Sequence, residues 1–277
     1  MHETYFQYDN ACYFMAHSVL KSNRPTLLFI HGLGDSSISY DNFLRSQQLS
    51  DFNLLIPDLL GHGRSSEASD YSFQHQTNGI IQQLNYLQNK LNSKLTNLIL
   101  VAHSMGSIHA TLLCESSLKQ HIKGFINVEG SITQYGSFVS ESAVKAVDEN
   151  RFSSWLNEFK QTTIYQKSAA SLPLRRYYAS LLFCNDDAFL QNAAEMRALS
   201  LSLPGKFSHL IGKKYAELAL PRIYCYGDTL AKETLNFLDE NKLDKKHFPC
   251  PNHFVMTECE TDFIFFLKEY VKTIMPH

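Results

Sequence analysis

Short apolar runs alternate along this chain with longer stretches in which apolar residues recur every three or four positions. The runs at 26–30, 52–56, 97–102, 125–128 and 222–226 lack polar alternation, which is typical of strands covered on both faces of a sheet. Between them, residues 75–91 carry Ile80, Ile81, Leu84, Leu87 and Leu91 at helical spacing, with polar residues on the other face. Strands that alternate with helices predict an α/β fold with a mostly parallel, doubly wound sheet.

The two ends of the chain carry other patterns. Residues 4–8 and 12–16 flank Asp9-Asn10, a turn-forming pair, so we expect an antiparallel hairpin at the edge of the sheet. Near the other end, a short run at 246–248 precedes a helical pattern at 261–274.

The alternation breaks between residues 133 and 220. This interval has no convincing strand but contains helix-like segments at 143–160 and 175–196. We therefore expect a core in two parts, residues 1–132 and 221–277, with a helical cap of residues 133–220 inserted between two of its strands.

Composition narrows the class of protein. Of the 277 residues, 44% are hydrophobic and 19% charged, a balance that allows a globular core. A formal charge of -2 gives no general attraction to nucleic acid. No apolar stretch is long enough to cross a bilayer and the first residues do not resemble a signal peptide, so we expect a cytoplasmic protein. The six cysteines form no CxxC pair and indicate thiols rather than a disulfide frame or a metal site, and no cofactor is expected.

A candidate nucleophile follows the strand predicted at 97–102. Val101-Ala102-His103-Ser104-Met105-Gly106 is the pattern G-x-S-x-G with alanine in the first glycine position, and a helix-like segment comes next. A sharp strand-to-helix turn needs very small residues two before and two after the serine, and Ala102 and Gly106 meet that limit. The alternative is a serine in an ordinary turn or helix N-cap.

Two further glycine-rich loops follow predicted strands. In His31-Gly32-Leu33-Gly34-Asp35-Ser36, the glycines allow backbone N–H groups to face a cavity above the strand ends, so Leu33 N–H and Met105 N–H are candidates for an oxyanion hole. The segment 58–66, with sequence DLLGHGRSS, follows the next strand.

The HGLGDS loop, the DLLGHGRSS loop and the AHSMGS elbow together resemble the α/β-hydrolase superfamily, in order and in structural context. The resemblance covers nearly all of the chain outside the insert. It implies the α/β-hydrolase fold, with the insert as a helical cap over the pocket. In that family the catalytic histidine lies in a late loop before the last helix, which points to His253; His31, His62 and His103 belong to the loop motifs.

The acid of the implied Ser-His-acid triad has two candidates. Most relatives place it in Gly-x-x-Asp after the strand that follows the insert, but here that segment reads Gly227-Asp228-Thr229-Leu230, with leucine at the expected position. Asp228 stays possible if that loop is shortened. Glu129 ends the strand predicted at 125–128, where some relatives carry the acid, and we favour it.

A serine at the elbow implies acyl transfer to water through an acyl-serine intermediate, so the resemblance indicates a serine esterase whose substrate is a small-molecule carboxylic ester, with thioesters and lactones as further candidates. Relatives that open epoxides or remove halides use aspartate at this position, so those activities are not expected. A hydrolase of carbon–carbon bonds and a ligand-binding protein without activity are the alternatives. Aromatic residues of the insert are candidates for an apolar pocket wall, and Arg175 and Arg176 for binding a substrate carboxylate; the wall candidates are Trp155, Phe159, Tyr165, Tyr177, Tyr178, Phe183 and Phe189.

Overall fold

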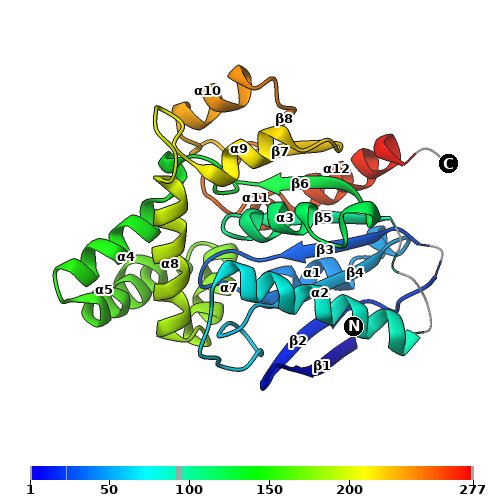
Figure 1. The fold of residues 1–277 in the computed structure, drawn as a ribbon, viewed down its shortest axis with the longest axis horizontal. Helices are drawn as coiled ribbons and strands as arrows, with labels where there is room; N and C mark the ends of the chain where they lie inside the picture. The colour runs from blue at the N-terminus through cyan, green and yellow to red at the C-terminus, as the bar shows by residue number, and fades with distance from the viewer. Residues whose placement is uncertain (1, 23, 92–94, 96, 276–277) are drawn as a thin grey trace.

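An eight-stranded sheet forms the centre of the computed structural model, which describes residues 2–22, 24–91, 95 and 97–275 (Figure 1). The strand order is β1-β2-β4-β3-β5-β6-β7-β8, and only the pairs β1–β2 and β2–β4 are antiparallel. This confirms the mostly parallel α/β sheet. The strands are β1 (His2–Tyr8), β2 (Ala11–His17), β3 (Thr26–Ile30), β4 (Asn53–Asp58), β5 (Leu98–His103), β6 (Ile122–Val128), β7 (Arg222–Tyr226) and β8 (Lys245–His247).

The first two strands form the predicted hairpin at the sheet edge. Asp9 and Asn10 both have positive φ, 52° and 60°, as the tightest hairpin turns require, and these residue types tolerate that conformation. At the centre, every residue of β3, β4 and β5 is buried, which explains why their sequences show no polar alternation.

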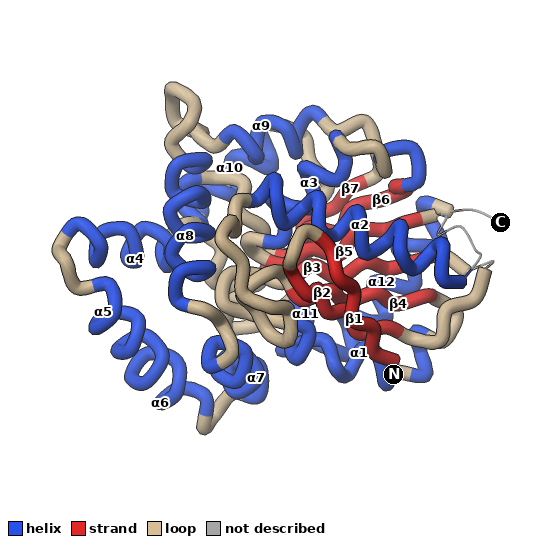
Figure 2. The backbone as a smooth tube through the Cα atoms, turned by 60° about the horizontal axis from the view of Figure 1, so that its bottom comes forward, coloured by secondary structure: helices blue, strands red, loops and turns tan. Residues whose placement is uncertain are grey.

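Helices cover both faces of the sheet (Figure 2). On one face, α3 (Gly106–Glu115) packs against α2 (Phe73–Leu91) and α9 (Leu210–Glu217). On the other, Phe43 of α1 (Asp41–Arg45) contacts Phe263 of α12 (Glu260–Ile274), with ring centroids 6.1 Å apart. The remaining helices of the core are α10 (Lys232–Glu240) and α11 (Val255–Glu258). No helix in the described ranges is long and apolar enough to span a membrane.

Between β6 and β7 the chain forms a helical lobe, which projects beyond the carboxyl ends of the central strands (Figures 1 and 2). Its helices are α4 (Phe138–Asp148), α5 (Phe152–Glu158), a π-helical turn at Phe159–Ile164, α6 (Tyr165–Ser168), α7 (Leu172–Leu182) and α8 (Asp186–Ser200). We call these elements the insert lobe. α9 lies outside it, because Tyr215 of α9 packs on Phe125 of β6 with ring centroids 5.3 Å apart.

Both helices expected in the insert are interrupted. The segment 143–160 breaks where Asn150 adopts a φ of 52°, and 175–196 breaks at Asn185, whose side chain accepts hydrogen bonds from Asp187 N–H and Ala188 N–H at the start of α8. Asparagine favours both conformations because its short polar side chain can replace a backbone partner. The helical spacing of apolar residues continues across both breaks, so that spacing alone did not predict them.

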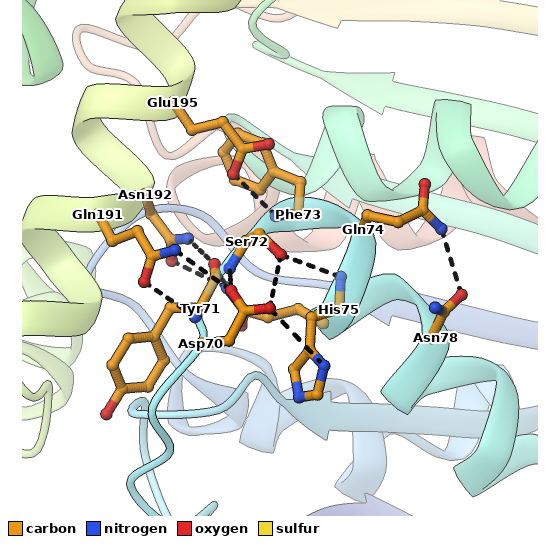
Figure 3. Close-up of polar contacts among 11 residues, drawn as sticks. Asp70, Tyr71, Ser72, Phe73, Gln74, His75, Asn78, Gln191, Asn192 and Glu195 are labelled. Atoms are coloured by element: carbon orange, nitrogen blue, oxygen red, sulfur yellow. Dashed lines mark hydrogen bonds and ion pairs between the residues drawn. The ribbon is translucent and has the colours of Figure 1, made fainter.

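Hydrogen bonds fix α8 of the insert lobe to the start of α2 (Figure 3). Phe73 N–H donates to Glu195 Oε2 at 2.9 Å, and Tyr71 N–H donates to Gln191 Oε1 at 2.9 Å. Asn192 Nδ2 donates to Tyr71 O at 2.6 Å. The first N–H groups of a helix have no intrahelical acceptor, so Glu195 of α8 supplies the acceptor that Phe73 N–H lacks, and the two bonds at Tyr71 hold α8 to the segment just before α2.

Candidate active site

Ser104 lies in a tight turn between β5 and α3 and has a φ of 51°, in a region that side-chain-bearing residues rarely adopt. Its N–H donates to Val128 O at 3.0 Å, which ties the turn to the neighbouring strand. Ala102 is fully buried, and a Cβ on Gly106 would lie 2.4 Å from Ile30 O. The small residues at these positions thus let the turn pack directly against backbone, as a nucleophile elbow requires.

Gly106→Ala is expected to destabilise the fold by about 3 kcal/mol or more, because the new methyl group overlaps with a backbone oxygen that has no free rotation to move away. Chemical denaturation checks this. Gly136→Ala is the matched control, since a Cβ there meets nothing within 4 Å. Equal stability of the two variants would contradict the packing argument.

The His253 ring lies beside Glu129, with Nδ1 3.2 Å from Oε2 of the carboxylate. A carboxylate accepts, so Nδ1–H is the donor and the other ring nitrogen, Nε2, carries the lone pair of the neutral imidazole. His103 stabilises the loop that contains His253, because its Nε2 donates a hydrogen bond to His253 O at 3.0 Å. The loop position predicted for His253 therefore places it next to one of the two candidate acids.

Glu129 and Asp228 have different surroundings. The Glu129 side chain is 4% exposed, and its Oε1 accepts Gly227 N–H at 2.6 Å, which leaves Oε2 for His253. Asp228 is half exposed and forms a 2.7 Å hydrogen bond with His247. The structure brings Glu129, not Asp228, to His253.

Ser104 and His253 border one cavity of about 440 Å³. No hydrogen bond joins the Ser104 hydroxyl to the ring within the described residues. In proteins without substrate such a contact is often long and shortens only when the reacting complex forms. Ser104 and His253 therefore border the same cavity, and Glu129 lies buried against the His253 ring, but Ser104 and His253 are not hydrogen-bonded to each other.

Leu33 lies in a tight turn closed by Asp35 N–H, which donates to Gly32 O at 3.2 Å, and Gly34 supplies the φ of 70° that this turn needs. Neither Leu33 N–H nor Met105 N–H donates to a protein acceptor among the described residues. Both residues are buried, and Leu33 borders the cavity. The Tyr177 hydroxyl, from α7 of the insert lobe, donates to Leu33 O at 3.0 Å and fixes this peptide segment.

The three histidines of the loop motifs, His31, His62 and His103, form hydrogen bonds with the backbone of the loops around the site. His31 donates from Nδ1 to Gly32 O and accepts Leu59 N–H at Nε2, and burial lowers its pKa to about 4. His62 donates to Leu60 O, and burial lowers its pKa to about 3. Burial also lowers the pKa of His103 well below its usual range. These rings are neutral at physiological pH and hold the loops together.

Apolar residues of the insert lobe form much of the cavity wall. Of the aromatic candidates, Phe159 and Tyr177 border the cavity. Sequence reasoning missed Phe138, Val139 and Met196, because nothing in their spacing separates a cavity wall from the interior of a lobe. Phe159 belongs to the π-helical turn, and such turns are frequent at functional sites because they shift side chains relative to a regular helix.

Arg175 and Arg176 do not border the cavity. Arg176 lies 3.9 Å from Glu260, and Arg175 donates to Ala169 O. Their side chains therefore have partners on the protein surface rather than in the pocket.

Asp35 is the carboxylate on the cavity wall, and burial raises its pKa to about 6. Its Oδ1 accepts Ser36 N–H at 2.8 Å and the Ser39 hydroxyl at 2.6 Å, whereas its buried Oδ2 has no partner among the described residues. The folded protein therefore binds a proton on the Asp35 carboxyl group more tightly than the unfolded chain does. Ionisation of Asp35 thus opposes folding.

Asp35→Asn is expected to stabilise the protein at pH 8 and not at pH 4. A pKa raised from 3.8 to about 6 corresponds to at most roughly 3 kcal/mol of stability, present below pH 4 and lost as pH rises to about 6. Asparagine can keep both hydrogen bonds at Oδ1 without this loss. Unfolding free energies between pH 4 and 8 test the prediction, with the surface variant Asp41→Asn as control; a difference from the native protein that does not change with pH would contradict it.

All six cysteines lie within the described residues and are free thiols. In the same part of the chain, no three His, Cys, Asp or Glu side chains are grouped so that they could hold a metal ion.

Comparisons with known proteins agree with this architecture. An epoxide hydrolase of Caballeronia sordidicola is 33% identical over 89 residues, which cover 31% of this chain and 25% of that protein. The chain spans about a quarter of the length of the curated relatives it matches. The enol-lactonase of Burkholderia xenovorans LB400 superimposes with a TM-score of 0.74 at 13% identity, covering 97% of this chain and 100% of that one. A putative aryl esterase of Burkholderia cenocepacia gives 0.72 at 14% identity, with all of both chains covered.

The profile of the alpha/beta hydrolase fold matches residues 25–211, which include the Leu33 turn, the elbow, Glu129 and most of the insert. With the sheet order and the elbow described above, this match shows that the chain belongs to the alpha/beta hydrolase family.

Proposed function

We propose that this protein is a serine hydrolase that cleaves a small carboxylic ester, a thioester or a lactone through an acyl-serine intermediate. The observation that carries the proposal is the buried Glu129 carboxylate against Nδ1 of His253, at a cavity that also contains Ser104 in a strained elbow. A hydroxyl, an imidazole and a buried carboxylate are the groups that acyl transfer to water needs.

In the proposed first half-reaction, the Ser104 hydroxyl oxygen attacks the carbonyl carbon while His253 Nε2 takes its proton. Glu129 keeps the Nδ1–H tautomer and stabilises the imidazolium that forms. Leu33 N–H and Met105 N–H donate to the oxyanion of the tetrahedral intermediate. The carbon–oxygen bond to the leaving alcohol then breaks, and the alcohol takes the proton from His253.

The second half-reaction uses the same groups with water in place of serine. His253 takes a proton from water as the water oxygen attacks the acyl-serine, and returns it to the Ser104 oxygen as the acid leaves. This sequence uses one water molecule and restores the protein.

The test is covalent labelling with a fluorophosphonate. We expect one adduct, located at Ser104 by peptide mass spectrometry, and none in Ser104→Ala. Ser116→Ala, just beyond the same helix and outside the cavity, is the control that should label normally. A folded protein that does not label would favour a ligand-binding role.

A further inference from the structure

The cavity wall carries an uncompensated negative charge. Among the described residues that border it there is no lysine or arginine, and Asp35 is the one carboxylate. Its side chain is 1% exposed and forms no ion pair in that part of the chain. The charged group that acts on it most directly is Asp58, which has the same sign.

The groups that donate hydrogen bonds to the Asp35 carboxylate are all neutral. Oδ1 has two donors, whereas Oδ2 has none. The Ser180 hydroxyl, which shares a hydrogen bond with Ser36, lies close enough to favour the ionised form of Asp35, whereas the Tyr177 hydroxyl donates to Leu33 O instead. None of these groups carries a positive charge, so the charge of the ionised carboxylate is not offset locally and acts across the cavity that Asp35 borders.

Asp35 is also close to the reacting centre. Its N–H closes the turn that contains Leu33, so the carboxylate is one tight turn away from the amide proposed for the oxyanion. A substrate with its carbonyl oxygen at Leu33 N–H therefore brings a substituent a few bonds away into the part of the cavity that Asp35 borders.

We propose that Asp35 is a specificity-determining residue that makes this pocket accept acyl chains ending in a cationic or neutral group and reject acyl chains ending in an anion. The inference rests on the proposed function, because it names the substrate class of the same site. A second carboxylate on a substrate would be repelled by the charge of Asp35, with no cation on the described cavity wall to offset the repulsion, whereas a cationic group would be attracted by that charge.

The test uses three nitrophenyl esters whose acyl chains share a propyl linker and end in a trimethylammonium, a tert-butyl or a sulfonate group. The three ends have similar shape and differ in charge. With each kcat/KM divided by the rate of spontaneous hydrolysis, we expect the cationic ester to exceed the anionic ester by roughly 100-fold in the native protein at pH 8, with the neutral ester between them.

The variant Asp35→Asn then tests whether the charge of Asp35 causes the difference between the cationic and the anionic ester. It keeps the shape and can keep both hydrogen bonds at Oδ1, so we expect the cation-to-anion ratio to fall by about tenfold or more, with the remainder due to Glu129. Asp41→Asn, in the same segment but outside the cavity, should leave the ratio unchanged. Asp35→Ser is a second variant without the charge if the asparagine variant folds poorly.

A native protein that hydrolyses the neutral ester with a cation-to-anion ratio near one would overturn the inference and leave the proposed function intact, as would a ratio that Asp35→Asn does not change. If none of the esters is hydrolysed, the proposed function fails instead. The inference is then tested by binding of methyl ketones with the same three ends. Trp155, the single tryptophan, stacks on Phe159 of the cavity wall with ring centroids 5.4 Å apart and reports binding by its fluorescence. The cationic ketone should bind more tightly than the sulfonate.

Discussion

Replacing His253 by glutamine should lower kcat for a simple nitrophenyl ester by roughly 10⁴- to 10⁶-fold, the range seen when a member of such a catalytic group is removed. Glutamine fills a similar volume but cannot take a proton from Ser104. Among the described residues that border the cavity, the other imidazole is His103, which is buried and whose Nε2 donates to His253 O, so we do not expect it to substitute. Steady-state kinetics over the full pH range of activity checks the prediction.

The control for this experiment is His247→Gln. That side chain is about half exposed, interacts with Asp228 and does not border the cavity. Turnover in this variant should stay near the native value. A His253→Gln variant that is well folded and retains more than about a hundredth of native kcat would contradict the assignment of the base.

Glu129→Gln should lower kcat by about 10³- to 10⁴-fold, the second largest effect expected. Glutamine can still accept Gly227 N–H, but it no longer supplies the charge that stabilises the imidazolium and selects the Nδ1–H tautomer. The fall should appear in kcat and kcat/KM together, because the lost interaction is made mainly in the transition state.

Asp228→Asn is the matched comparison, since it removes one carboxylate from the other candidate position. Its side chain contacts His247 at the surface, so turnover should change by less than about threefold. If Asp228→Asn proved the more damaging of the two, the triad proposed here would have the wrong acid.

The backbone frame could be predicted from the sequence because its causes are local. Strands covered on both faces contain uninterrupted apolar runs, and Asp9-Asn10 has the conformational preferences of a tight turn. The elbow was recognisable because its serine and the small residues around it lie in one short segment, although the backbone that Gly106 approaches, at Ile30, is distant in sequence.

The acid and the pocket wall depend on contacts between distant segments. Glu129 is 124 residues from His253, and its second oxygen is held by Gly227, so no local pattern separates it from Asp228. The motif containing Asp35 was recognised, but its position as an unpaired carboxylate on the cavity wall was not foreseeable, because that position depends on which side chains the fold brings around it. Breaks in the insert were missed because single asparagines end helices whose apolar spacing continues.

The hydroxyl of Tyr177 ties a part of the insert lobe to the peptide of Leu33. A displacement of α7 that widens the pocket must either break this bond or carry Leu33 with it, and both disturb the amide proposed to hold the developing negative charge. Acyl transfer would then take place while the Tyr177–Leu33 hydrogen bond is intact, and the product would leave in a conformation in which α7 has moved.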